Sequence, residues 1–124
     1  YMGGETSNPN YEEVCLGNTG HVEVVHIYFD SKIISYFELL TCFWNNHNPT
    51  TLNRQGVDIG TQYKSVIFYY SEKQNEVAQN SLFEQSKKWK NPIVTQLISA
   101  SVFYRAEEFH QDYLSKNNLG SCKV

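Results

Sequence analysis

The sequence predicts a two-layer α/β or α+β sandwich, in which strands alternate with helices. Three runs rich in β-branched and aromatic residues, 21–29, 65–70 and 93–98, have the composition of strands. Helical patterns that begin with capping signatures follow the first two runs. The chain has 124 residues and shows no internal repeat or linker, and we therefore expect a single domain over residues 1–124.

The first half of the chain is predicted to form one loop, one strand and one helix. The first twenty residues contain several glycines and an Asn-Pro pair, and this turn chemistry predicts a loop. Residues 21–29 are predicted to be a strand that ends at Asp30. Ser35 and Glu38 have the spacing of a capping box, and they begin a helix that Pro49 ends.

The second half begins with residues 48–64, which are polar and contain glycine. This segment is predicted to be a long irregular loop, and long loops in compact domains often carry function. Ser71 and Gln74 form a second capping signature, and Pro92 follows the helix that they begin. The elements predicted after the loop are strand 65–70, helix 71–89, strand 93–98, helix 107–116 and a loop tail.

The composition excludes several classes of function. The net charge of −3 gives no basic excess for binding nucleic acid or an anionic membrane. No long apolar run predicts a membrane span, and the four histidines lack the paired spacing of a metal site. The three cysteines are an odd number, which leaves at least one free thiol. A free thiol favours a reducing compartment, and we therefore expect a cytoplasmic protein.

Glu23 is the first candidate for chemistry. Side chains alternate along a strand, so Glu23 would share a face with Val25, Ile27 and Phe29. A carboxyl on an apolar face is desolvated, which raises its pKa and lets it act as an acid near neutral pH. The alternative is that Glu23 lies at the start of the strand and reaches water, and the pattern alone favours this second interpretation.

The polar loop before the second strand is the next candidate. Asp58, Thr61 and Tyr63 lie where a strand can hold a loop rigidly, which suits a functional site. Alternatively, Asp58 and Thr61 satisfy the hydrogen bonds of their own turn, and Tyr63 is a half-buried anchor. The residue pattern alone favours the alternative.

The three cysteines differ in their local context. Cys122 lies in a Gly-containing segment near the chain end, where a thiol can reach another sulfur, or where it is simply a spare cysteine. Cys42 lies in the middle of a predicted helix, without the helix N-terminus or the cation that activates a thiol, and we assign it no catalytic role. Cys15 lies in the leading loop and is interpreted as a packed small hydrophobe.

Several short motifs follow one another along the chain. The most specific are a Thr-Gly-His-x-Glu run at 19–23 and a Gly-Thr-Gln-Tyr run at 60–63. The other short motifs are Asn8–Cys15, His47–Thr50, Asn53–Gly56, Phe103–Glu107 and His110-Gln111. Together these motifs resemble the peptide methionine sulfoxide reductases of type A, and the resemblance extends over essentially the whole chain.

The resemblance implies an oxidoreductase of protein repair under oxidative stress, which reduces methionine S-sulfoxide, free or in proteins. In such enzymes a cysteine thiolate attacks the sulfoxide sulfur, giving methionine and a sulfenic acid. A second cysteine then forms a disulfide, which thioredoxin reduces, or dithiothreitol in its place. The resemblance also implies that no metal, flavin or nicotinamide is bound and that the protein is a monomer.

The roles of individual residues follow from the same resemblance. Glu23 matches a proton-donating carboxyl, and Tyr11 and Tyr63 match two phenols that hydrogen-bond the sulfoxide oxygen. Asp58 matches an acidic residue that orders the polar network, and Cys122 matches a resolving cysteine. Two further positions are assigned to substrate binding: His110 and Tyr113.

The sequence departs from the family at the nucleophile. The family carries it in a Gly-Cys-Phe-Trp-Gly run, which belongs upstream of Tyr1 and does not occur in these residues. The implied fold is a ferredoxin-like two-layer sandwich with a mixed sheet, and its first strand and helix belong to the same upstream segment. Two alternatives remain open: a non-catalytic relative that binds methionine sulfoxide or a partner protein, and a reductase whose nucleophile is Cys15 or Cys42.

Overall fold

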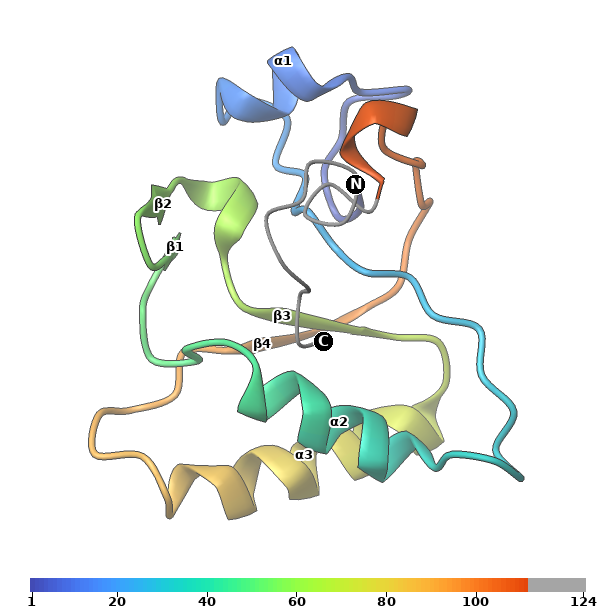
Figure 1. The fold of residues 1–124 in the computed structure, drawn as a ribbon, viewed down its shortest axis with the longest axis vertical. Helices are drawn as coiled ribbons and strands as arrows, with labels where there is room; N and C mark the ends of the chain where they lie inside the picture. Colours follow the sequence, from blue (N-terminus) through green and yellow to red (C-terminus); the bar gives the residue numbers. More distant parts are fainter. Residues whose placement is uncertain (112–124) are drawn as a thin grey trace.

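The computed structural model describes residues 1–111, which form a mixed α and β structure with small sheets (Figure 1). The mixed class is as predicted. The helices are α1 (Tyr11–Cys15), α2 (Tyr36–Asn45) and α3 (Glu72–Ser86), and the strands are β1 (Arg54–Gln55), β2 (Asp58–Ile59), β3 (Val66–Tyr69) and β4 (Gln96–Ser99). Two short 3₁₀ turns are η1 (Thr61–Tyr63) and η2 (Glu108–His110).

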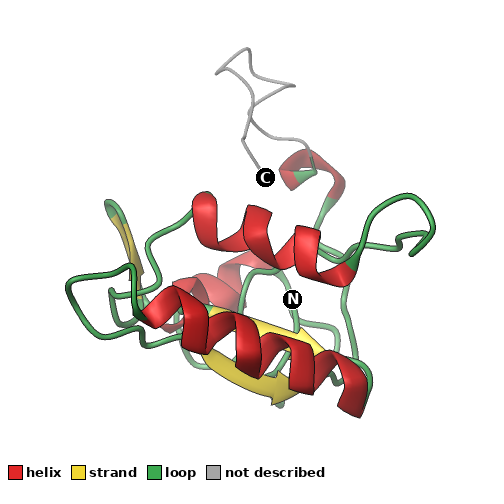
Figure 2. Cartoon of the chain, turned by 90° about the horizontal axis from the view of Figure 1, so that it is seen from below, coloured by secondary structure: helices red, strands yellow, loops and turns green. Residues whose placement is uncertain are grey.

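The lower part of the molecule in Figure 1 is a β3–α3–β4 unit, and helix α2 packs beside α3. Strands β3 and β4 are parallel, with Val66 opposite Gln96 and Tyr69 opposite Ser99. Helices α2 and α3 lie side by side against one face of this sheet (Figure 2). The core between the two helices and the sheet consists of four buried residues: Leu40 and Trp44 from α2, Ile67 from β3 and Ala78 from α3.

The first two predicted helices and the second strand are confirmed, because local signals set their boundaries. Ser35 accepts a hydrogen bond from the Glu38 amide at 3.0 Å, and Ser71 accepts one from the Gln74 amide at 3.2 Å. Both serines are the N-caps of their helices. The third strand begins three residues later than predicted, because the Val94 amide binds the Pro49 carbonyl at 2.8 Å instead of joining β3.

The strand predicted over residues 21–29 is wrong for the described residues. The only ladder contact there is an isolated bridge between Met2 and Val22, and the Glu23 amide donates to the Gln62 carbonyl at 3.0 Å. The chain then runs across the molecule without a strand beside it in residues 1–111. A period of two indicates an extended segment, but pairing depends on a neighbour that the local pattern does not contain.

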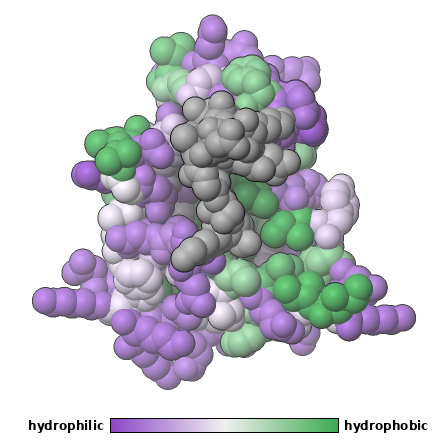
Figure 3. Space-filling view, viewed as in Figure 1, coloured by the Kyte–Doolittle hydropathy of each residue, from purple (hydrophilic) through white to green (hydrophobic). Residues whose placement is uncertain are grey.

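The face of this segment that was expected to be buried is therefore open. Val25 is 68% exposed and Ile27 is 46% exposed. Apolar atoms gather at the lower right of the face drawn in Figure 3, where the segment and the loop before α2 pass. The segment, α2 and β3 line a cavity of about 390 Å³.

The leading loop contains an unpredicted helix, α1. Asn10 is its N-cap and forms a capping box with Glu13, with hydrogen bonds of 2.8 and 3.1 Å. The loop 48–64 was predicted correctly in outline, but it contains the β1–β2 hairpin and the η1 turn. Of the helix predicted over 107–116, the described residues form only η2, and the rest lies outside them.

The upper part of Figure 1 is tied together by contacts between the two ends of the described chain. The Tyr104 amide donates to the Tyr1 carbonyl at 2.9 Å, and Met2 and Val22 exchange hydrogen bonds of 3.2 and 2.9 Å. The buried His21 side chain accepts from the Gly4 amide at 3.0 Å through Nδ1. These bonds bring the start of the chain, the segment after Gly20 and the residues before η2 into one assembly.

We expect Trp44→Ala to destabilise the fold by about 3–5 kcal/mol, because it opens a cavity in the core. Trp44 is 1% exposed, and its indole N–H donates to the Ser81 hydroxyl at 2.8 Å, which the substitution leaves without that partner. Phe37→Ala on the same helix is the matched control, since Phe37 is 56% exposed. Urea unfolding measures both variants, and equal losses would contradict this assignment of the core.

Candidate active site

Four of the residues predicted for the site come together where α1, the extended segment and the 48–64 loop meet. Glu23 borders η1 because its amide binds the Gln62 carbonyl, and Tyr63 follows Gln62 directly. The charges of Glu23 and Asp58 both act on the Tyr63 phenol, and Tyr11 in turn senses Tyr63 and Glu23. The structure therefore brings together the carboxyl groups of Glu23 and Asp58 and the phenols of Tyr11 and Tyr63.

The environment raises the pKa of Glu23. Partial desolvation is the largest cause, and the negative charge of Asp58 acts in the same direction, while His110 and a hydrogen bond from Tyr63 oppose the rise. Glu23 is nevertheless an exposed residue. Its desolvation was predicted to come from a buried strand face. This is wrong, because Val25 and Ile27 on that face are exposed.

Both phenols of the cluster have raised pKa values and are protonated at neutral pH. Burial is the largest cause for Tyr63, and the negative charges of Glu23 and Asp58 add to it. A side-chain hydrogen bond with Cys15 is the largest cause for Tyr11 and raises its pKa to about 12. Tyr11 and Cys15 lie four residues apart on α1 and share one face of the helix. The cluster thus presents two hydrogen-bond donors beside a carboxyl whose pKa is raised.

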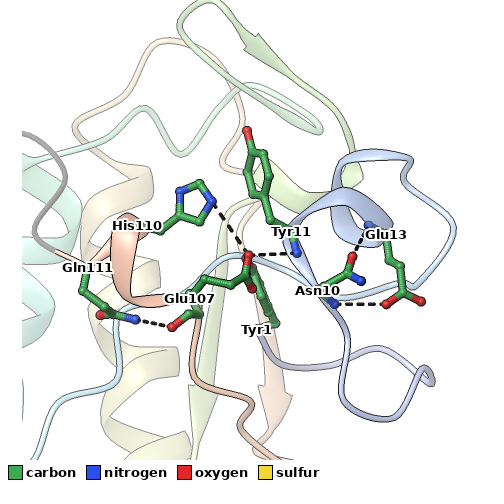
Figure 4. Close-up of polar contacts among 8 residues, drawn as sticks. Tyr1, Asn10, Tyr11, Glu13, Glu107, His110 and Gln111 are labelled. Carbon is green, nitrogen blue, oxygen red and sulfur yellow. Dashed lines mark hydrogen bonds and ion pairs between the residues drawn. The ribbon is translucent and has the colours of Figure 1, made fainter.

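His110 lies against Tyr11, with ring centroids 4.1 Å apart (Figure 4). Its Nε2 atom is 3.9 Å from Oε2 of Glu107, and the same oxygen accepts the Tyr11 amide at 3.1 Å. The other oxygen of Glu107 accepts the Tyr1 hydroxyl at 3.3 Å. Sequence reasoning assigned Glu107 no role, since its position in the 103–107 run shows nothing of these distant partners.

A cavity of about 730 Å³ adjoins the cluster. Its lining includes Glu23, Tyr1, His110 and Gln111. The predicted substrate-binding residue His110 therefore faces the same space as the carboxyl acid. The described residues contain no group of three or more side chains able to hold a metal ion, and none of their helices is long and apolar enough to cross a membrane.

The cysteines differ from expectation at one position. Cys15 is exposed, and its interpretation as a packed hydrophobe is wrong; its position on α1 beside Tyr11 keeps it at the surface of the cluster. Cys42 is exposed on α2, in the lower part of Figure 1. Two predicted site residues, Tyr113 and Cys122, lie outside the described residues.

A half-buried histidine fixes the start of β3 close to the site. His47 accepts or donates at both ring nitrogens, with the Phe43 carbonyl at 2.6 Å and the Ser65 hydroxyl at 2.7 Å. Ser65 in turn lies 2.7 Å from the Thr95 hydroxyl. Burial lowers the pKa of His47, which favours the neutral ring that such a network needs. The network joins the residues after α2 to the starts of both strands. It thereby fixes Ser65, which follows Tyr63 by two residues in the sequence.

The sequence profile of a family described as peptide methionine sulfoxide reductase matches residues 1–124. The chain belongs to the peptide methionine sulfoxide reductase family. Among its curated relatives, the MsrA protein of Methanothermobacter thermautotrophicus is 52% identical over 124 residues, covering 98% of this chain and 73% of that protein. Peptide methionine sulfoxide reductase A2-1 of Oryza sativa subsp. japonica is 50% identical, covering 99% of this chain and 66% of that protein.

Solved structures agree with this membership. Reduced Mxr1 of Saccharomyces cerevisiae matches with a TM-score of 0.92 and 39% identity, over 98% of this chain and 71% of that chain. Methionine sulfoxide reductase A of Corynebacterium diphtheriae matches with a TM-score of 0.79 and 34% identity, over 98% and 66%. Members of the family are oxidoreductases that reduce methionine sulfoxide in peptides, and this is the activity to which the chain is assigned.

We expect the stability of the chain to depend on the protonation of Glu23. Its folded-state pKa is raised above 4.5, so the folded chain binds this proton more tightly than the unfolded chain does. The stability that Glu23 contributes is therefore complete below pH 4.5 and is lost as the pH rises through the raised value. Glu23→Gln should gain stability over the unsubstituted chain as the pH increases, measured by urea unfolding between pH 4 and 8. A gain that shrinks with increasing pH would show that the pKa of Glu23 is lowered instead.

Proposed function

We propose that this chain supplies the acid and the hydrogen-bond donors of a peptide-methionine (S)-S-oxide reductase. The observation that carries the proposal is the gathering of Glu23, with its raised pKa, and the protonated phenols of Tyr11 and Tyr63 at one place. A sulfoxide oxygen becomes strongly basic when a thiolate attacks its sulfur. Donors already aimed at that oxygen stabilise the developing charge, and a protonated carboxyl can transfer its proton to it.

The reaction balances with the chemistry that these residues offer. The thiolate sulfur of a nucleophilic cysteine attacks the sulfoxide sulfur, and Glu23 gives its proton to the oxygen. The hydroxyl then passes from the methionine sulfur to the cysteine sulfur, so that the methionine S–O bond and the transient S–S bond break while the cysteine S–O bond forms; methionine leaves, and the cysteine is a sulfenic acid. A second thiol displaces water from the sulfenic acid and forms a disulfide, and an external dithiol such as thioredoxin reduces that disulfide with two electrons.

Asp58 has a supporting part in this proposal. It lies on β2, and its negative charge raises the pKa of both Glu23 and Tyr63. Both groups must keep their protons to act as donors at neutral pH, so the carboxylate of Asp58 helps to maintain the active protonation state. His110 opposes this effect on Glu23 and borders the cavity, which places it to contact the substrate.

We place the nucleophile in a Gly-Cys-Phe-Trp-Gly run outside these residues and the resolving thiol at Cys122. The chain spans 73% of the archaeal relative and 71% of the yeast chain, which leaves room in those proteins for such a segment. A strand beside residues 23–29 and the open edge of β3 would complete a ferredoxin-like mixed sheet. A cytoplasmic monomer that uses thioredoxin completes the proposal.

The intact mass and N-terminal sequence of the protein from its natural source test where the nucleophile lies. A mass above 14.4 kDa with a Gly-Cys-Phe-Trp run ahead of Tyr1 is the expected result. A product of 14.4 kDa that begins at Tyr1 would contradict it. Cys15 would then be the thiol to test, because it already contacts Tyr11, and Cys15→Ser would abolish any reduction that depends on it.

We expect Glu23→Gln to lower kcat by about 10²–10⁴-fold, because glutamine keeps a donor but cannot transfer the proton.

Tyr63→Phe should lower kcat by about 10²–10³-fold through the loss of one donor to the developing oxyanion. The rate of the unsubstituted enzyme should fall as the pH rises through the raised pKa of Glu23, since the protonated carboxyl is the active form.

These rates are measured with a peptide containing methionine S-sulfoxide and dithiothreitol, in the reductase whose mass and N-terminus have been established. Tyr69→Phe is the matched control for the phenol, because Tyr69 lies at the end of β3 and lines neither of the two cavities described above, so kcat should stay unchanged. Equal rates for Glu23→Gln and the unsubstituted enzyme would remove Glu23 as the acid.

A further inference from the structure

Glu107 connects three segments that are far apart in the sequence. Its Oε2 atom accepts the backbone amide of Tyr11, 96 residues away, at 3.1 Å. Its Oε1 atom accepts the hydroxyl of Tyr1, 106 residues away, at 3.3 Å, and His110 lies 3.9 Å from Oε2. The side chain is 30% exposed, so its two oxygens are committed largely to these partners (Figure 4).

The amide that Glu107 binds is the first of helix α1. A helix of five residues is too short to hold its own conformation, and its stability depends on contacts at its ends. The capping box of Asn10 and Glu13 satisfies the amides of those two residues, and the carboxylate of Glu107 satisfies that of Tyr11. A negative charge at this end also suits the helix dipole. The direction in which α1 leaves its N-cap is therefore set partly by Glu107.

The direction of α1 decides where the Tyr11 phenol lies. Tyr11 is the first residue of the helix, and its ring packs against His110 at 4.1 Å with the planes at 37°. His110 belongs to η2, which begins directly after Glu107. One carboxylate thus holds the backbone of Tyr11 and lies beside the ring that supports its side chain, as the labelled residues of Figure 4 show.

We propose that Glu107 is a positioning residue of the reductase, which holds the Tyr11 phenol where it can donate to the sulfoxide oxygen. This inference rests on the proposed role of Tyr11. Glu107 does not border the cavity beside Glu23 and acts through Tyr11. Since catalytic donors must lie within a fraction of an ångström of their productive position, the loss of Glu107 affects the transition state more than the binding of substrate.

A structural measurement on the 124-residue chain tests the contact itself. The amide proton of Tyr11 should lie downfield in a ¹H–¹⁵N spectrum, and Glu107→Ala should move it upfield. Glu12→Gln is the matched control, because it removes an exposed carboxyl from the first turn of the same helix. A Tyr11 amide that responds to neither variant would overturn the proposed contact, whatever the activity of the enzyme.

A double-mutant cycle in the reductase tests the route of the effect. Glu107→Ala should lower kcat by about 10–100-fold and change KM by less than about threefold. In the Tyr11→Phe background, Glu107→Ala should cost nothing further, because the group it positions is already absent. Glu107→Gln keeps one acceptor for the Tyr11 amide and should recover part of kcat.

The outcomes separate this inference from the proposed function. An unchanged kcat for Tyr11→Phe would overturn the role of Tyr11 and the positioning role with it. A loss for Tyr11→Phe together with an unchanged kcat for Glu107→Ala would overturn the positioning role alone. Losses that multiply in the double variant, or a rise in KM with kcat unchanged, would also overturn it. Thermal unfolding of Glu107→Gln, which keeps the side-chain volume, shows that the comparison is made on folded protein.

Discussion

The packing of α2 and α3 on one face of the β3–β4 pair is the constraint on which the site depends. Burial of Leu40, Trp44, Ile67 and Ala78 fixes the position of β3, and the hydrogen bonds of His47 fix the residue before it. The η1 turn lies immediately upstream, so the core helps to place Tyr63 together with the hydrogen bond from its amide to the Gly60 carbonyl. The Gln62 carbonyl then holds the amide of Glu23. An apolar core thereby helps to bring the Glu23 carboxyl and the Tyr63 phenol together.

The electrostatic character of the site follows from crowding acidic groups instead of pairing them with cations. The charge of Asp58 makes the loss of a proton from Glu23 and from Tyr63 less favourable, and the charge of Glu23 does the same for both phenols, whereas the Tyr63 hydrogen bond favours the ionised form of Glu23. His110 opposes this tendency at Glu23, so the carboxyl is neither fully isolated nor neutralised by a close ion pair. The arrangement keeps protons available without burying any group completely, and the cavity beside it leaves space for a substrate side chain.

The elements that could be predicted are those whose determinants lie within a few residues. Ser35 and Ser71 mark the starts of α2 and α3, and the composition of 65–70 marks β3. The extended conformation after His21 was predicted from its period of two. Its pairing with another strand is a long-range property that this period does not contain, and its apolar face is exposed. Helix α1 was missed although Asn10 and Glu13 have capping-box spacing, because the surrounding glycines favoured a loop. Glu107 could not be assigned a role, since both of its hydrogen-bond partners lie about a hundred residues away.

The pairing of Tyr1 with Tyr104 has a consequence for how the chain assembles and opens. The β3–α3–β4 unit closes a loop of about thirty residues, whereas the contact between Tyr1 and Tyr104 closes nearly the whole described chain. Contacts between residues far apart in sequence cost more chain entropy and are reached later in folding. We therefore expect the helical core to form first and the cluster of Glu23, Tyr11 and Tyr63 to form last. In the reverse direction, local unfolding is expected to release the cluster while the core persists, and the Tyr11 and Tyr104 amides should then exchange with solvent faster than the amides within β3.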